Sequence, residues 1–231
     1  MDAALLAAIR SGDRRALSRA ITLIEQDGAE SGLPAPSAVI GFTGPPGAGK
    51  STLISALIDV VRSRGETVAV LAVDPSSPVT GGAILGDRIR MQGHVDDDGV
   101  YIRSMATRGH LGGLARATRG AASLLAEAGF DRVMVETVGV GQSEVEVMGL
   151  AEVVVLVLGP SWGDQIQADK AGIVEIADVF VVNKGDRPGI QEVERALRET
   201  ADARRAMILV TTATSGEGVA ELLTEIDRLI V

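Results

Sequence analysis

A glycine-rich run that ends in lysine and serine is the segment of this chain with the clearest chemical meaning. GPPGAGKS occupies residues 44–51, between the apolar run AVIGF and the helical pattern TLISALIDVV. Its glycines allow successive backbone N–H groups to turn toward a phosphate chain, Lys50 can reach the outer phosphates, and Ser51 can bind Mg2+. A structural glycine turn would not explain the Lys-Ser pair at a helix start. We therefore predict a P-loop, with phosphate contacts from Gly44, Pro45, Gly47, Ala48, Gly49, Lys50, Ser51 and Thr52.

A second short motif, NKGD at residues 183–186, indicates which base is bound. After a predicted strand, the Asn183 amide can contact a purine and the Lys184 stem can cover its plane. The Asp186 carboxylate can accept from both N1–H and the exocyclic amine of guanine, a paired donor edge that adenine lacks. Such a turn is also common without any ligand, but the upstream P-loop favours GTP or GDP.

The segment TTAT at residues 211–214 follows the last predicted strand. A backbone N–H there could contact guanine O6. An ordinary loop is the alternative, because Ser, Thr and Gly also favour loops. The residues concerned are Thr212, Ala213 and Thr214.

Three carboxylates and one glycine are candidates for the hydrolytic end of the site. Asp74 ends the run VAVLAVD and Asp87 lies in ILGDRIRM, so both could approach Mg2+ and the γ-phosphate. Each alone would also suit a helix cap or a solvated turn. Glu136 ends the run RVMVE, where many GTPases have Asp, and can reach Mg2+ through water or polarise the attacking water. The backbone N–H of Gly139 then has the place of a γ-phosphate sensor.

The elements that must position these residues form a repeating βα pattern. Continuous apolar runs predict seven strands, as expected for a mostly parallel sheet that is covered on both faces. They span 39–42, 68–73, 100–103, 132–136, 153–158, 179–183 and 207–211, with helices predicted at 50–64, 111–128, 190–200 and 217–230. We predict an α/β P-loop NTPase with a doubly wound sheet.

A short helical arm is expected before the sheet. Helices are predicted at residues 3–10 and from Asp13 to about Gln26, the second with Leu17, Ile21 and Ile24 on one face. A stretch rich in Gly, Pro and Ser follows at 27–38. We expect an N-terminal arm and linker at 1–38, packed on a GTPase domain at 39–231.

Composition limits the remaining classes. The 231 residues contain no cysteine, which excludes disulfides, thiolate metal sites and a cysteine nucleophile. A formal charge of −9 opposes nonspecific binding to nucleic acid or anionic membranes. The longest apolar runs are too short to span a bilayer, and the N-terminus lacks a signal-peptide pattern. We expect a cytoplasmic protein whose partners are proteins or small molecules.

Taken in order, the motifs resemble the MeaB/ArgK group of GTPases, which includes the human protein associated with methylmalonic aciduria type A. The resemblance covers roughly residues 5–220 and rests on GFTGPPGAGKSTL, AVDPSSP, GGAILGDRIRM, RSMATRGHLGGLARAT, VETVGVGQSE and VVNKGD. It implies a SIMIBI-class G protein that acts as chaperone of an adenosylcobalamin-dependent acyl-CoA mutase, similar to methylmalonyl-CoA mutase. GTP binding and hydrolysis would gate cofactor loading and protect the mutase.

Residue roles follow from the same motif match. The resemblance implies Mg2+ ligands at Ser51, Asp74, Asp87 and Glu136, and catalytic roles for Lys50, Asp87, Glu136 and Lys170. Two other functions stay open: a kinase or ATPase of a basic amino-acid (LAO/AO, arginine/ornithine) transport system, and a noncatalytic nucleotide-gated module. NKGD argues against ATP and hence against the transport function.

The chain departs from the family pattern in two places. SWGDQIQADKAGI at 161–173 lies where the family has an additional switch loop that touches the mutase; it keeps Asp164, Gln167 and Lys170 but has Trp162 and Asp169. Lys170 could communicate with the nucleotide or simply begin a helix, and Trp162 could serve an interface or the core. The chain also stops at Val231, where the family continues into a dimerising extension, so both a monomer and a homodimer stay open.

Overall fold

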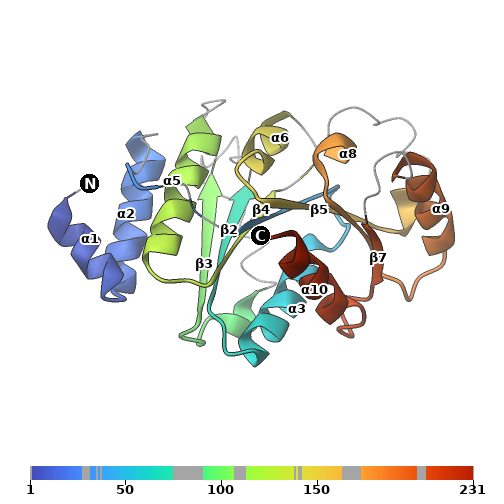
Figure 1. The fold of residues 1–231 in the computed structure, drawn as a ribbon, viewed down its shortest axis with the longest axis horizontal. Helices are drawn as coiled ribbons and strands as arrows, with labels where there is room; N and C mark the ends of the chain where they lie inside the picture. The colour runs from blue at the N-terminus through green and yellow to red at the C-terminus, as the bar shows by residue number, and fades with distance from the viewer. Residues whose placement is uncertain are drawn as a thin grey trace.

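The computed structural model describes residues 2–27, 32–34, 36, 38–74, 91–106, 113–137, 139, 142–162, 173–201 and 207–230, and all structural statements below refer to these. They form one seven-stranded sheet in the order β3-β2-β4-β1-β5-β6-β7, with every neighbouring pair parallel (Figure 1). The strands are β1 (Val39–Thr43), β2 (Val68–Asp74), β3 (Val100–Ala106), β4 (Arg132–Thr137), β5 (Val153–Leu158), β6 (Val179–Asn183) and β7 (Met207–Thr211). The predicted α/β class and parallel doubly wound sheet are confirmed.

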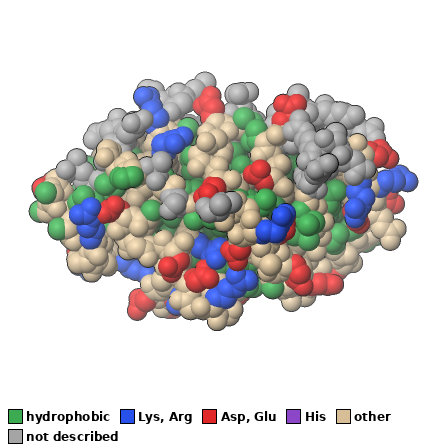
Figure 2. All heavy atoms as spheres, viewed as in Figure 1, with side chains coloured by type: hydrophobic (Ala, Val, Ile, Leu, Met, Phe, Trp, Pro, Cys, Tyr) green, Lys and Arg blue, Asp and Glu red, His purple; other side chains and the backbone are tan. Residues whose placement is uncertain are grey.

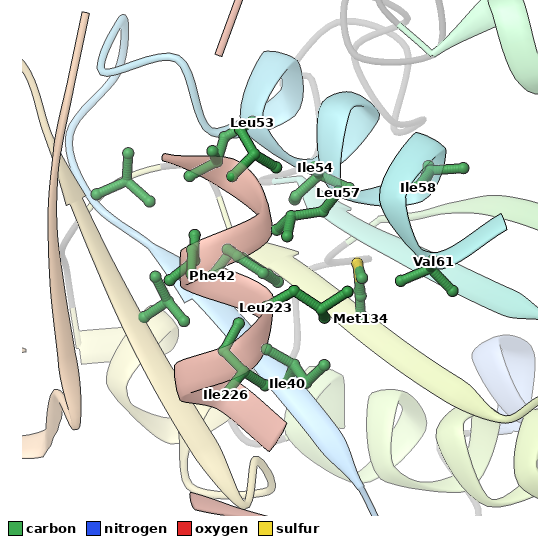
Figure 3. Close-up of a cluster of buried hydrophobic side chains, with 14 of the residues drawn as sticks. Ile40, Phe42, Leu53, Ile54, Leu57, Ile58, Val61, Met134, Leu223 and Ile226 are labelled. Atoms are coloured by element: carbon green, nitrogen blue, oxygen red, sulfur yellow. The ribbon is translucent and has the colours of Figure 1, made fainter. Parts of the chain in front are cut away.

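Helices cover both faces of this sheet. On one face lie α3 (Lys50–Ser63) and α10 (Val219–Leu229), whose side chains interdigitate with alternate residues of the central strands. Figure 3 shows this aliphatic layer: Leu53 and Leu57 of α3 and Ile226 of α10 gather around Phe42 of β1. Strands β1, β5 and β6 are buried along their whole length, which explains why they consist mainly of aliphatic residues rather than alternating polar ones.

The opposite face is covered by four helices, which are α5 (Gly113–Glu127), α6 (Gln142–Met148), α8 (Ile173–Ile176) and α9 (Ile190–Ala201). Close packing there depends on Gly41 of β1: a Cβ at this position would lie 2.6 Å from Met148 Sδ and 3.0 Å from Ala151 Cβ. Helix α6 therefore rests directly on the strand that leads into the predicted P-loop.

The N-terminal arm consists of α1 (Ala3–Arg10) and α2 (Arg14–Asp27). The Asp13 carboxylate accepts from the backbone N–H groups of Arg15 and Ala16 at 2.8 and 3.1 Å, which caps α2 as predicted. Leu17 and Ile21 enter the same buried cluster as the strands, so the arm packs on the sheet. Arg14 also donates to the carbonyls of Asp98 and Val100 at 2.6 and 2.9 Å, at the start of edge strand β3.

Ion pairs join elements at the amino end of the strands. Arg132, the first residue of β4, pairs with Glu66 and with Asp227 of α10, and Arg64 reaches the other oxygen of Asp227 at 2.7 Å. Figure 2 shows acidic and basic side chains interspersed over the face that carries α3 and α10. Within the described ranges, none of the helices has the length and hydropathy needed to cross a bilayer.

All seven predicted strands are present, and the structure adds details at their ends. Strand β3 continues to Ala106, three residues beyond the predicted end. Two 3-10 turns, η1 (Gln92–His94) and η2 (Pro160–Trp162), and the four-residue α8 were not predicted. Helix α6 spans Gln142–Met148, directly after the sequence VETVGVG.

Candidate functional site

The predicted P-loop connects β1 to α3 at the carboxyl end of the strands, beside β4 and β5 where the chain switches from one side of β1 to the other. Such a switch point is where open α/β sheets bind ligands. Two of its glycines are required by close contacts. A Cβ on Gly44, whose φ is +140°, would lie 2.1 Å from Val157 O, and one on Gly49, whose φ is +97°, would lie 2.4 Å from Asn183 Nδ2. Side chains at these positions would displace the loop.

Lys50 begins α3 and is 6% exposed. Its Nζ donates to the carbonyls of Gly44 and Pro45 at 2.7 and 3.1 Å, so the ammonium lies inside the curve of the loop. The helix start has no side-chain cap, and Gly49 precedes it in the left-handed conformation. An ammonium beside the amino end of a helix creates a positive potential that suits phosphate oxygens.

Ser51 and Glu136 meet beside this lysine. The Ser51 hydroxyl donates to Glu136 Oε1 at 2.7 Å, and Glu136 is 2% exposed at the end of β4, where it pairs with Phe42 of β1. Hydroxyl and carboxylate oxygens are the hard donors that Mg2+ prefers, and adjacent ligands of an octahedral Mg2+ lie about 2.9 Å apart. The two oxygens therefore fit the ion in both chemistry and spacing.

Of the other two predicted carboxylates, the structure describes only Asp74, and of that residue only the backbone. Asp74 is the last residue of β2, at the same edge of the sheet as Glu136, and its backbone pairs with Ala106 of β3. Asp87 and Lys170 lie outside the described residues.

Gly139 lies against the P-loop: it forms a β-bridge with Gly44, and its carbonyl accepts from the Thr43 hydroxyl at 3.2 Å. Thr43 is a contributor that the sequence analysis missed.

The Asn183 side chain ends β6 and contacts two loops of the candidate site. Its Nδ2 donates to the carbonyls of Ala48 and Gly49 at 3.1 and 3.4 Å, and its Oδ1 accepts from the Thr211 hydroxyl and the Ala213 N–H at 3.1 and 3.2 Å. A side-chain amide has two donor hydrogens and two acceptor lone pairs, so these four contacts use the hydrogen-bonding capacity of Asn183. The amide therefore bridges the P-loop and the loop after β7, and the purine contact of Asn183 stays a prediction.

Lys184 reaches back to the P-loop as well. Its Nζ donates to Gly47 O at 2.6 Å, and its backbone is left-handed with φ +67°, a conformation that costs a non-glycine residue about 1 kcal/mol or more. Asp186 follows on the exposed side of the loop. The long Lys184 stem thus lies next to the P-loop, and the Asp186 carboxylate is open to a ligand.

Two of the three predicted donors to guanine O6 already have acceptors. The N–H of Thr212 donates to Glu217 O at 3.0 Å, and that of Ala213 to Asn183 Oδ1 at 3.2 Å. Thr214 is exposed, and within the described ranges its N–H meets no protein acceptor. The sequence also missed Thr211, the buried residue that ends β7 and holds the Asn183 amide. A polar residue ending an apolar strand was the available signal for both Thr43 and Thr211.

Trp162 lies in η2, close to this group of loops. Its indole is partly buried against the cluster that contains Phe180 and Val182 of β6 and Ile190 of α9. Of the two alternatives left open for this residue, packing on the core is the one observed.

Comparisons with known proteins agree with this arrangement. The family model described as "Methylmalonyl Co-A mutase-associated GTPase MeaB" matches residues 5–230. A Pyrococcus horikoshii relative assigned as a GTPase is 48% identical over 97% of the chain and 76% of its own length. The mouse mitochondrial methylmalonic aciduria type A homolog is 41% identical over 79% of the chain and 46% of its own length. A crystal structure described as that of a LAO/AO transport system kinase superposes with a TM-score of 0.73 at 27% identity, over 99% of this chain and 76% of that one.

Proposed function

Because the chain belongs to the MeaB family of methylmalonyl-CoA mutase-associated GTPases, we propose that this GTPase acts as a chaperone of an adenosylcobalamin-dependent acyl-CoA mutase. GTP binding and hydrolysis would gate cofactor loading and protect the mutase from inactivation. The observation that carries the nucleotide part is the convergence of the NKGD residues on the P-loop, through Asn183 on Ala48 and Lys184 on Gly47. We assign the arm and linker to residues 1–38, the GTPase domain to 39–231, and the protein to the cytoplasm.

Nucleotide binding would use the P-loop as its phosphate cradle. The Lys50 ammonium now donates to Gly44 O and Pro45 O, and oxygens of the β- and γ-phosphates would replace these carbonyls as acceptors. The adjacent N–H groups at the start of α3 would bind the same oxygens. Replacement of Lys50 would therefore remove both the positive charge that binds phosphate and the hydrogen bonds to Gly44 O and Pro45 O that hold the P-loop.

The hydrolytic end is built around Ser51 and Glu136. These two residues would hold Mg2+, with Asp74 and Asp87 as further proposed carboxylates, and the ion would neutralise charge that develops on the phosphates. The buried Glu136 carboxylate would orient the attacking water, either directly or through a second water. The Gly139 N–H, beside Gly44, would sense the γ-phosphate.

Guanine selectivity would come from Asp186 and Lys184. The exposed carboxylate would accept from N1–H and the exocyclic amine, and the lysine stem would cover the purine plane. Thr214 is the proposed donor to O6, because the N–H groups of Thr212 and Ala213 are engaged elsewhere. We also propose that the 161–173 segment contacts the mutase and that Lys170 reports nucleotide state to it.

A titration with three nucleotides tests the proposal. The purified protein is titrated calorimetrically with GDP, the nonhydrolysable analogue GMPPNP, and ADP, each with Mg2+. We expect guanine nucleotides to bind at least 100-fold more tightly than ADP. Equal or tighter ADP binding would overturn the guanine assignment and favour a transport kinase, the activity for which the structurally similar LAO/AO protein is named.

The chaperone role needs a second measurement. GTP turnover is followed with and without purified methylmalonyl-CoA mutase, and bovine serum albumin serves as the protein control. We expect at least a tenfold stimulation that is specific to the mutase. Turnover that is unchanged by any acyl-CoA mutase of this cofactor class would leave a GTPase but remove the chaperone assignment.

A further inference from the structure

A short turn lies beside both loops that would hold the nucleotide. Residues 159–162 follow β5 and are closed by a hydrogen bond from Trp162 N to Gly159 O at 3.2 Å. On one side, a Cβ on Gly159 would lie 3.7 Å from Ala48 Cα of the P-loop. On the other, a Cβ on Gly189 would lie 3.1 Å from Pro160 O and 3.6 Å from Pro160 Cβ. We call residues 159–162 the support turn.

The support turn lies against the loop at residues 183–189, which we call the guanine loop. Its first end is attached to the P-loop through Asn183 and Lys184. Its last residue, Gly189, has φ +93° and lies against Pro160 directly before α9. Asp186 stands midway between the two attachments and is exposed. Because both ends are held, the position of its carboxylate depends on both.

Trp162 attaches the support turn to the hydrophobic core. The indole lies against the cluster formed by Phe180, Val182 and Ile190, which belong to the strand before the guanine loop and the helix after it. Ile190 is 7% exposed, so the residue next to Gly189 is itself fixed. A movement of the support turn would therefore move the end of the guanine loop at Gly189. Lys50 and Ser51, which would bind phosphate and Mg2+, belong to α3, a different element.

We infer that the support turn positions the guanine loop, and that Pro160, Trp162 and Gly189 set guanine selectivity without touching the base. This inference rests on the proposed function, since it concerns how that same site recognises guanine. Pro160 and Trp162 are positioning residues: their effect reaches the nucleotide through Asp186. The absence of a side chain at Gly189 allows the close approach on which the arrangement depends.

The first test is Gly189→Ala, measured by calorimetric titration with GDP and with inosine diphosphate, which lacks the exocyclic amine. We expect the Kd for GDP to rise about tenfold and the Kd for inosine diphosphate by less than threefold, because only GDP uses both acceptor interactions of Asp186. The matched control is Gly129→Ala. Gly129 has a similar φ of +86° but no atom within 4 Å of a built Cβ, so it carries the same backbone strain without the contact.

A second test does not depend on that variant folding. Trp162 is the only tryptophan, so its fluorescence reports on the support turn alone. We expect saturating GDP to shift its emission, Trp162→Phe to keep the GDP to inosine diphosphate affinity ratio, and Trp162→Ala to reduce this ratio about fivefold.

Three outcomes decide the matter. A reduced affinity ratio in Gly189→Ala, with Gly129→Ala unchanged, supports the inference. An unchanged ratio in Gly189→Ala, or a ratio reduced equally in both alanine variants, overturns it. Failure of the wild-type chain to prefer GDP over ADP would instead overturn the proposed function, and the inference with it.

Discussion

The hydroxyl of Ser51 donates to Oε1 of Glu136 across 2.7 Å, which joins the first turn of the P-loop helix to the end of β4. The two residues are 85 positions apart in the sequence, and their contact is buried. The proposed Mg2+ ligand Ser51 and the proposed water-orienting carboxylate Glu136 thus lie side by side in the structure. Preorganised groups of this kind avoid the cost of rearrangement during the reaction.

Replacement of Glu136 by Gln separates binding from hydrolysis. The neutral amide keeps the shape but loses the charge that orients water, so we expect single-turnover GTP hydrolysis to fall about 100-fold and the Kd for GDP to change less than threefold. Asp87→Asn should show the same pattern. Glu199→Gln, at an exposed position of α9, serves as control. Unchanged turnover in both site variants would refute the catalytic assignment.

Asn183→Asp tests the bridge between the two loops. A carboxylate oxygen would then face the carbonyls of Ala48 and Gly49 where an N–H donor now lies, so two hydrogen bonds become repulsive contacts. We expect a loss of about 2–4 kcal/mol in the free energy of unfolding, measured by urea denaturation. The Kd for GDP should rise at least tenfold. Full stability with weakened nucleotide binding would mean that the amide contacts the base directly.

Gly41→Ala probes the packing of α6 on β1. The added methyl would lie 2.6 Å from Met148 Sδ, which must move, so we expect a loss of about 1–3 kcal/mol in unfolding free energy. Gly93→Ala is the control, because a Cβ there meets no atom within 4 Å. Combination with Met148→Ala should recover part of the loss if overpacking is its cause. A double variant less stable than either single variant would argue against that explanation.

Acid stability should depend on Asp131. Hydrogen bonds from the backbone N–H and the hydroxyl of Thr67 hold the pKa of this carboxyl below its ordinary value of 3.8. The charged form is favoured in the folded state, so the stability that Asp131 contributes is complete above about pH 3.8 and disappears as pH falls through the lower folded pKa.

The comparison is between wild type and Asp131→Asn. At pH 6 we expect a Tm lower by about 2 °C in the variant, and by pH 3 the difference should have narrowed. Asp96→Asn, in an exposed turn, controls for the loss of one charge. A Tm difference that stays constant from pH 6 to pH 3 would show that ionisation of Asp131 does not contribute.

The fold was predictable because its signals are local. Most strands are runs of mainly aliphatic residues, and helix starts carry recognisable residues such as Asp13, so all seven strands and the main helices agree with expectation. The end of β3 was missed because Ser104 interrupts the apolar run. Four-residue α8 is too short to show a helical period.

The site was predictable at the level of motifs but not of contacts. Ser51 of the P-loop motif contacts Glu136 of the VETVGVGQSE motif, and the roles proposed for Lys50, Ser51 and Glu136 stay predictions. The role of Asn183 was not predictable, because its amide bonds to carbonyls 134 and 135 positions away and to Thr211. Contacts of that range depend on how the strands are ordered in space. Asp87 and Lys170 lie outside the described residues, and their roles stay predictions.

The attachment of Arg14 to the carbonyls of Asp98 and Val100 has a consequence for the behaviour of the chain in concentrated solution. Val100 begins edge strand β3 and Asp98 lies just before it; unpaired acceptors at a sheet edge can attract a strand from another molecule and begin aggregation. A guanidinium already occupies them, and the arm that carries it shields the strand. We therefore expect a shortened chain without the N-terminal helices to expose the Val100 carbonyl at this edge to pairing with another molecule.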